Sequence, residues 1–230
     1  MPLKVIARTP VEKLAYRLAP YRVAPTSFCA LFEPHCDAPV TVERYQRPKE
    51  GRCGVHVEMN VPCRKCEKCL QFRRLRWRDR MVAEMAHASA KGFRTWFGTL
   101  TFSPPHWAGV LSEAKKLARG TEAERVEKAA YAHVQRYLKR LRKTAPQSKF
   151  RFVCIMEFGG QTGREHFHLL VHEVGPRPLV KRHLDENWRS FTVWRLTYGE
   201  GTGAASYVAK YLTKQNSRPR ASLRYGAPSP

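Results

Sequence analysis

The sequence predicts an α+β protein with one main domain, preceded by an irregular N-terminal arm. Two long segments, residues 64–90 and 122–143, have the apolar periodicity of amphipathic helices, and four short segments are rich in aromatic and β-branched residues. Two of the short segments, 150–158 and 166–172, are separated by the turn-like sequence GGQTGRE, which predicts a β-hairpin. With 230 residues, 43% of them hydrophobic, the chain is long and apolar enough to bury a core of ordinary size.

The first predicted helix, residues 64–90, combines an apolar face with a basic stripe, and Gly92 is placed to end it. The apolar face consists of Leu70, Trp77, Met81, Met85 and Ala88. The basic stripe consists of Arg73, Arg76 and Arg80, which are candidates for contacts with a nucleic-acid backbone. These arginines are also compatible with a solvated helix face. The apolar face of the second helix consists of Val126, Ala130, His133, Tyr137 and Leu141.

The two remaining predicted strands are TWFGTLTF (95–102), which Pro104 ends, and FTVWRLTY (191–198). A glycine-rich turn, GEGTGAA, leads from the latter into a short helix, SYVAKYLTK. This pattern predicts three regions: a proline-rich irregular arm with short structured pieces (1–62), a main domain that begins with a cysteine-rich basic helix (63–214), and a tail that is expected to be disordered (215–230).

The charge balance predicts a polyanionic partner. The chain has 42 Lys+Arg against 19 Asp+Glu, a formal net charge of +23, which favours nucleic acid without indicating catalysis. No stretch approaches the roughly 18 consecutive apolar residues of a membrane helix, and the first residues lack the apolar centre of a signal peptide. We therefore expect the protein to act inside a cell, with no membrane partner.

His166, Phe167 and His168 form a His-apolar-His triplet within a predicted strand. Because side chains alternate along a strand, the two imidazoles share one face and can hold one divalent ion. A metal site that acts on phosphate usually has an oxygen ligand as well, and the predicted hairpin would bring Glu157 across from His166. The triplet is equally compatible with two polar residues on a half-exposed strand, and Glu157 with an acid that faces solvent.

Tyr207 and Tyr211 are four residues apart in SYVAKYLTK, which places both phenols on one helix face, with Lys210 between them. A phenol has a pKa of about 10 and is a poor nucleophile near neutral pH. A nearby metal ion or cation would assist its attack on a phosphate. Taken alone, the pair is more typical of a packed amphipathic helix that uses tyrosine in its core, and only its combination with the histidine strand favours the nucleophile role.

Seven cysteines are present, and Cys63, Cys66 and Cys69 form C-x-x-C-x-x-C, a spacing at which thiolates bind zinc. Zinc takes four ligands in structural sites. Candidates for the fourth ligand are Cys53, which is our first choice, His56 and Cys36. Such a zinc would tie the arm to the following helix, whereas an iron–sulfur cluster and unligated thiols are the alternatives.

A strand ending TLTF, then GREHFHLLVHE, then YVAKY, together resemble the HUH endonucleases of rolling-circle replication. They resemble in particular the replication initiators of microviruses, which are small single-stranded DNA phages. Those initiators also tend to carry an arginine-rich helix after P-C-x-x-C-x-x-C, which residues 62–69 match. The resemblance extends over roughly residues 60–214. Family members often have proline directly before the His pair, where this chain has Glu165.

The resemblance implies an antiparallel sheet with the His strand at its centre and helices packed on it. It implies a metal-dependent, site-specific endonuclease that nicks single-stranded origin DNA, leaves a 5′ phosphotyrosine and a 3′ hydroxyl primer, and later rejoins the strand. His166 and His168 would bind Mg²⁺ or Mn²⁺, Tyr207 and Tyr211 would be the nucleophiles, and Lys210 would be an assisting cation. The host DNA polymerase and helicase would be partners in the cytoplasm of a bacterial cell.

Two alternatives stay open at this point. A zinc-stabilised protein that binds single-stranded nucleic acid without cutting it would explain the charge and the cysteines. A transposase or plasmid relaxase would use the same chemistry in a different biological setting. The sequence contains no G-x-x-x-x-G-K-[ST] motif, so we expect any unwinding to come from a partner.

Overall fold

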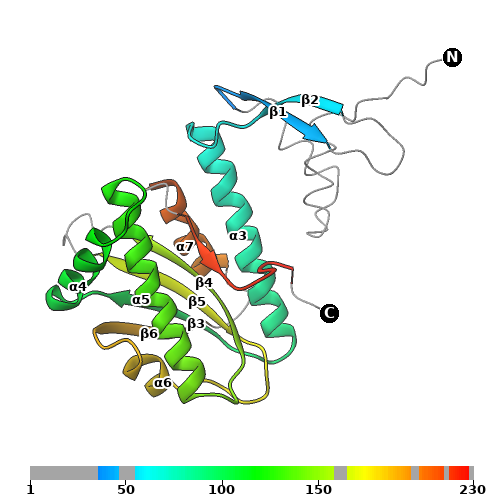
Figure 1. The fold of residues 1–230 in the computed structure, drawn as a ribbon. Helices are drawn as coiled ribbons and strands as arrows, with labels where there is room; N and C mark the ends of the chain where they lie inside the picture. The colour runs from blue at the N-terminus through cyan, green and yellow to red at the C-terminus, as the bar shows by residue number, and fades with distance from the viewer. Residues whose placement is uncertain (1–35, 47–54, 158–164, 198–201, 215–217, 228–230) are drawn as a thin grey trace. The chain divides into compact units, whose positions relative to one another are not determined.

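The computed structural model describes residues 36–46, 55–157, 165–197, 202–214 and 218–227 (Figure 1). The chain divides into two compact units, Met1–Arg74 and Leu75–Pro230. The boundary falls within helix α3 (Glu67–Ala90). Among the described residues, no helix combines the length and apolar character that crossing a membrane requires.

The first unit contains an antiparallel pair of strands, β1 (Val40–Gln46) and β2 (Val55–Val61), with Val40 opposite Val61. Their sequences, VTVERYQ and VHVEMNV, are rich in β-branched residues, which favour extended backbone. The hairpin lies within residues 1–62, for which proline-rich composition predicted an irregular arm with short structured pieces. Its bounds were not predicted, because prolines flank both strands and the period-two pattern is weak.

The second unit is built on a five-stranded antiparallel sheet with the order β6-β3-β5-β4-β7. The strands are β3 (Thr95–Thr101), β4 (Phe150–Glu157), β5 (His166–Glu173), β6 (Phe191–Thr197) and β7 (Arg220–Ala221). The His-x-His strand β5 is central, which confirms the predicted α+β fold. The predicted strand boundaries agree with the observed ones to within one residue.

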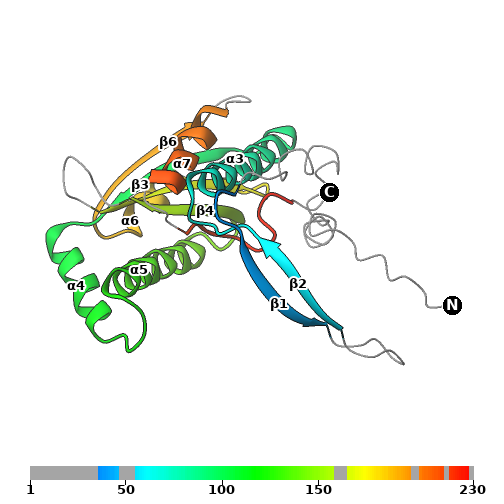
Figure 2. The same cartoon turned by 90° about the horizontal axis from the view of Figure 1, so that it is seen from above.

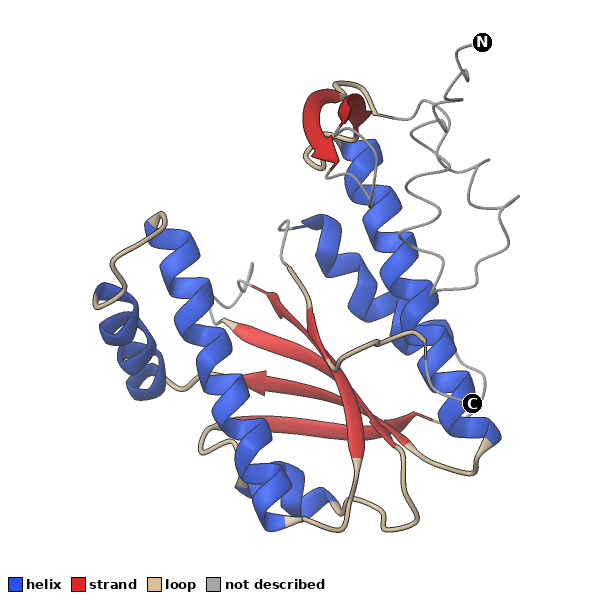
Figure 3. Ribbon diagram, turned by 45° about the vertical axis from the view of Figure 1, so that its right-hand side comes forward, coloured by secondary structure: helices blue, strands red, loops and turns tan. Residues whose placement is uncertain are grey.

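Helices cover both faces of this sheet (Figures 2 and 3). One face carries α4 (Pro104–Lys115), α5 (Glu122–Thr144) and α6 (Lys181–Glu186), and the other carries α7 (Thr202–Lys214) and the second half of α3. Two separate buried clusters follow this division. On the α5 face, Phe167 and Leu169 of β5 pack with Tyr137; on the α7 face, Leu170 packs with Met81.

The alternation along β5 decides which side chains reach each face. Phe167, Leu169 and Val171 belong to the core under α5, so His166 and His168 face α7. Helix α7 begins at Thr202, within the segment expected to be a glycine-rich turn. The predicted tyrosine helix is therefore longer at its N-terminal end and lies against the face that carries the histidines.

Three elements of the second unit, α4, α6 and β7, were absent from the sequence-based prediction. Pro104 and Pro105 begin α4 after ending β3, because a fixed φ suits the first turn of a helix. Near the C-terminus, β7 pairs with β4, and Tyr225 is buried with its hydroxyl 2.6 Å from Nε2 of His172. These contacts lie within residues 215–230, for which composition predicted a disordered tail.

Candidate metal site and tyrosine pair

The antiparallel register brings three predicted metal ligands together. Glu157, the last residue of β4, lies directly opposite His166 at the start of β5. His168 lies two residues further along the same face. The Nε2 atoms of His166 and His168 are each 2.9 Å from Oε2 of Glu157. We call these three residues the His–Glu triad.

The donor set and spacing of the triad fit a divalent metal ion. One ligand atom from each residue lies within 4.8 Å of the other two, so the three atoms converge on one point. Bonds of about 2.1 Å at right angles separate adjacent ligands by about 3.0 Å, close to the observed 2.9 Å. Two imidazoles and one carboxylate suit Mn²⁺ and other first-row metals, and a carboxylate also suits Mg²⁺. The triad supplies three of the six ligands of an octahedral ion, which leaves three positions for substrate oxygen atoms or water.

Two residues of the triad are buried, and a neighbouring side chain orients one of them. His168 is 3% exposed and Glu157 is 6% exposed. Burial lowers the pKa of His168 to about 4, against the opposing hydrogen bond with Glu157, so its imidazole is neutral near pH 7. Neutral imidazole is the form that binds a metal ion. Thr99 Oγ1 lies 3.3 Å from Nδ1 of His168, a contact that fixes the orientation of the ring.

Sequence reasoning missed Thr99 and Phe97 as neighbours of the site. Phe97 stacks on His168, with ring centroids 5.9 Å apart. Both residues belong to TWFGTLTF, and the sequence shows that their side chains share one face of that strand. The sequence does not show that this strand pairs with β5, and so it could not place Phe97 and Thr99 beside His168.

The two tyrosines of α7 pack directly on the triad. The ring of Tyr211 stacks on His168 with centroids 4.4 Å apart, and the Tyr207 ring meets His168 edge-on at 5.4 Å. The two phenol rings lie 5.4 Å from each other. Tyr207 is 42% exposed, whereas Tyr211 is only 4% exposed. The structure thus brings the predicted nucleophiles and the predicted ligands into one cluster.

The two tyrosines differ in their electrostatic surroundings. Burial raises the pKa of Tyr211 well above its ordinary value, and the hydrogen bond with Tyr207 and the charge of Glu157 act in the same direction. Lys210 Nζ lies 3.9 Å from the ring centroid of Tyr207 and 4.9 Å from that of Tyr211. The ammonium group therefore lies nearer to the exposed phenol.

The three predicted DNA-binding arginines are all half-buried. In the second unit, the guanidinium group of Arg80 lies 4.8 Å from the ring centroid of Trp77, and its stem is close to Gly226. The side chain of Arg80 therefore packs against Trp77 and the backbone of Gly226. A role for Arg73, Arg76 and Arg80 in DNA binding stays a prediction.

The predicted cysteine ligands come together in the first unit. Cys36, Cys63, Cys66 and Cys69 place their sulfur atoms within 4.8 Å of one another, and we call these four residues the cysteine cluster. Cys53, our first choice for the fourth ligand, lies outside the described residues. Its place in the described cluster is taken by Cys36, a candidate that spacing alone could not select.

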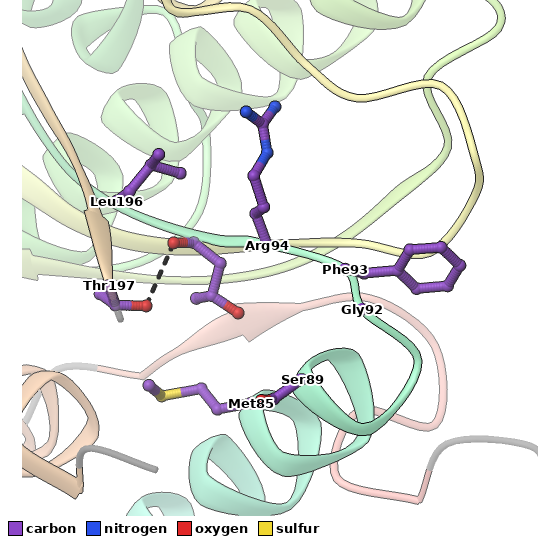
Figure 4. Close-up of a pocket in the computed structure, with 8 residues that line it drawn as sticks. Met85, Ser89, Gly92, Phe93, Arg94, Leu196 and Thr197 are labelled. Carbon is purple, nitrogen blue, oxygen red and sulfur yellow. Dashed lines mark hydrogen bonds between the residues drawn. The ribbon is translucent and has the colours of Figure 1, made fainter. Parts of the chain in front are cut away.

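A separate pocket of about 220 Å³ lies at the other end of β3 (Figure 4). Met85 and Ser89 of α3 line it together with Thr95 and Thr197, whose side chain donates to the Thr95 carbonyl oxygen at 3.1 Å. No residue of the triad or of the tyrosine pair lines this pocket. Because Thr95 and Thr101 are at opposite ends of β3 and Thr101 pairs with His166, the pocket is distinct from the candidate site.

Fold and site define an α+β protein whose central strands carry a metal-binding geometry beneath a tyrosine-bearing helix. The family model for replication-associated protein ORF2/G2P matches residues 95–216, which include every strand and helix that builds this site. The chain belongs to this family of replication-associated proteins.

Two curated relatives support the assignment. The chain is 26% identical over 174 residues to the replication-associated protein ORF2 of Spiroplasma virus 4, an alignment covering 69% of this chain and 49% of the relative. It is 27% identical over 173 residues to the replication-associated protein ORF4 of Chlamydia phage 1, covering 67% of this chain and 38% of the relative. The matched region thus spans less than half of either relative. No solved structure matches the chain.

Proposed function

We propose that this protein is a phage replication initiator that nicks single-stranded origin DNA by tyrosine attack. The observation that carries the proposal is the contact between the two halves of the site: Tyr207 and Tyr211 pack on His168, a member of the His–Glu triad. A metal-binding geometry and a pair of phenols, each ambiguous alone, form one cluster on one face of the sheet. The family of replication-associated proteins supports the same conclusion.

The reaction exchanges one phosphate ester for another. The Oη atom of Tyr207 forms a bond to the scissile phosphorus, while the bond from that phosphorus to the 3′ oxygen breaks. The phenol gives up its proton, and the departing 3′ oxygen gains one, which leaves a free 3′ hydroxyl group and a 5′ phosphotyrosine. The reverse attack, by a 3′ hydroxyl on the phosphotyrosine, rejoins the strand without an external energy source.

The residues around the phenol assist this exchange. The Lys210 ammonium group, 3.9 Å from the ring centroid of Tyr207, stabilises the negative charge that develops on the phenol oxygen. The His–Glu triad would hold Mg²⁺ or Mn²⁺ through His166, His168 and Glu157. Such an ion would supply positive charge to polarise the scissile phosphate. Tyr211 serves as the second nucleophile, for a later cleavage after Tyr207 has become occupied.

The same sheet face provides a surface for single-stranded DNA. Phe191 and Val193 on β6 are 55% and 56% exposed. They lie opposite Thr101 and Thr99, which in turn lie opposite His166 and His168. In an antiparallel sheet, directly opposed residues share a face, so this apolar surface adjoins the triad. Bases stack on such side chains, while the net charge of +23 attracts the phosphates.

The biological setting follows from the chemistry and the family. A 3′ hydroxyl primer is useful only with a DNA polymerase and an unwinding enzyme, and we propose that the bacterial host supplies both. Arg73, Arg76 and Arg80 would contribute to binding the displaced strand. The site of action would be the cytoplasm of the infected cell.

The test is formation of a covalent protein–DNA adduct. The purified protein is incubated with labelled single-stranded oligonucleotides tiled across its own replicon, with Mn²⁺, Mg²⁺ or EDTA. We expect an adduct on a denaturing gel for one tile, dependent on metal and absent from the Tyr207→Phe/Tyr211→Phe variant. Tight binding by both proteins with no adduct from any tile would refute the nuclease function and favour a binding protein.

A further inference from the structure

We propose that the cysteine cluster binds one structural Zn²⁺, with Cys36 as the fourth ligand, and that this ion closes the β1–β2 hairpin onto the first turn of α3. The four cysteines belong to the first unit, and all of their sulfur atoms lie within 4.8 Å of one another. The inference is independent of the nicking function, because no residue of the His–Glu triad or tyrosine pair takes part.

The spacing of the sulfur atoms fits a tetrahedral metal site and does not fit disulfides. Zinc–sulfur bonds of about 2.3 Å separate the ligands of a tetrahedron by about 3.8 Å. The Sγ atoms of Cys63 and Cys69 are 4.0 Å apart. A disulfide would require about 2.05 Å, and all four cysteines of the cluster are free thiols. Four sulfur ligands are typical of zinc and of iron–sulfur sites, and the observed sulfur spacing matches a single tetrahedral zinc ion.

The backbone around the cluster is shaped to hold thiolates. The amides of Lys65 and Cys66 donate to Sγ of Cys63 at 3.4 and 3.3 Å, and the amide of Cys63 donates to Sγ of Cys36 at 3.2 Å. Arg64 adopts φ 64°, a left-handed conformation that lets the chain fold back around Cys63. The backbone amides that follow β2 are therefore turned towards the sulfur atoms of Cys36 and Cys63, at the base of the hairpin.

Charge and helix geometry favour the same occupant. The carbonyl of Cys66 accepts the first hydrogen bond of α3, from Leu70 at 3.0 Å, so Cys66 and Cys69 lie at the positive end of the helix dipole. Four thiolates and Zn²⁺ carry a net charge of −2. Lys68 partly balances this charge, and its ammonium group also forms an ion pair with Asp37 at 2.6 Å.

The position of Cys36 gives the ion a structural consequence. Cys36 and Cys63 are 27 residues apart and flank the paired ends of β1 and β2, where Val40 lies opposite Val61. An isolated two-stranded hairpin is marginally stable in water. A metal ion that bridges its base removes much of the conformational freedom of the intervening loop in the unfolded chain. The hairpin therefore depends on the metal ion for its order.

The direct test uses the wild-type chain and measures its zinc content and the reactivity of its cysteine thiols. Elemental analysis of the reduced protein should find one zinc ion per chain that survives brief exposure to EDTA. Iodoacetamide labelling followed by mass spectrometry should show the four cysteines of the cluster protected in zinc-loaded protein and modified after stripping with a strong chelator. Modification of Cys36 at the same rate in both states, or iron in place of zinc, would overturn the proposal.

Variants identify the fourth ligand. Stripped proteins are titrated with Cd²⁺, and thiolate-to-cadmium charge transfer is measured in the ultraviolet. We expect Cys36→Ser to lose about a quarter of the band and to bind at least about a hundredfold more weakly, and Cys36→His to recover affinity. Cys53→Ser is the matched control and should behave as the wild type. Loss of the band in Cys53→Ser, with full binding in Cys36→Ser, would contradict Cys36 as the ligand.

Discussion

Tyr207 should be the first nucleophile, and the two tyrosines should differ sharply when replaced by phenylalanine. Tyr207 is 42% exposed, whereas Tyr211 is 4% exposed and stacks on His168 at 4.4 Å. A phosphate can therefore reach Oη of Tyr207 without displacing a packed ring. The surroundings of Tyr211 also raise its pKa. Each rise of one pH unit in a pKa lowers the fraction of phenolate near neutral pH about tenfold, which corresponds to about 1.4 kcal/mol.

The expected magnitudes follow from these contacts. Tyr207→Phe removes the attacking oxygen, so the rate of the first covalent step should fall at least about a hundredfold, equivalent to about 2.7 kcal/mol in the barrier. Tyr211→Phe removes only the hydrogen bonds of a buried phenol, each worth about 0.5–1.5 kcal/mol, so the first step should slow by no more than about tenfold.

The assay is single-turnover formation of the adduct on an oligonucleotide with one cleavage site, with enzyme in excess. The two single variants serve as matched controls for each other, because they remove the same atom four residues apart. A second cleavage, measured on an oligonucleotide with two sites, should be lost in Tyr211→Phe. Equal loss in both variants during the first turnover, or a larger loss in Tyr211→Phe, would refute the reasoning.

Three further predictions concern DNA affinity, pH and stability. Phe191→Ala should weaken binding of single-stranded DNA by about 1–3 kcal/mol in a fluorescence titration, since a base loses its stacking partner. Burial lowers the pKa of His172 to about 3, below the value of about 6.5 in the unfolded chain, so the unfolded state takes up the proton first as the pH falls. Between those pH values the free energy of unfolding should fall by up to about 1.4 kcal/mol per pH unit, and His172→Gln should reduce the slope in denaturant titrations. Glu84→Gln should destabilise the fold by about 3–5 kcal/mol in the same titrations, because Glu84 is 1% exposed and forms two hydrogen bonds with Arg151.

Each of these predictions has an outcome that contradicts it. Leu111→Ala, on α4 at the opposite sheet face, is the control for DNA binding, and equal weakening by both variants would remove Phe191 from the DNA surface. An unchanged pH slope in His172→Gln would mean that other groups govern acid sensitivity. A Glu84→Gln protein as stable as the wild type would show that the buried ion pair contributes no net stability.

The fold was predictable where local pattern decides it. The helices at 67–90 and 122–144, and the strands that carry His166 and Glu157, follow from periodicity and composition. Residues 1–62 and 215–230 were harder: prolines flank β1 and β2, and β7 has only two residues and pairs with the distant strand β4. Proline was ambiguous too: Pro104 marks both the end of β3 and the start of α4.

The candidate site was predictable to the extent that it lies on one hairpin and one helix. Alternation placed His166 and His168 on one face, and the hairpin placed Glu157 opposite them. Sequence could not show that α7 covers this face, nor that Tyr211 would be buried while Tyr207 stays accessible. Both facts depend on the order of the strands and the packing of α7, which are long-range properties.

The most direct test of the account links metal binding at the triad to the chemistry. Mn²⁺ is titrated into metal-free protein, and bound Mn²⁺ and the rate of adduct formation are measured on the same samples. The two curves should share one midpoint, and Glu157→Gln should shift both to higher Mn²⁺ by at least about tenfold, since a charged ligand is lost. Full-rate adduct formation without a divalent ion, or curves unchanged in Glu157→Gln, would contradict the proposed metal-dependent tyrosine nuclease.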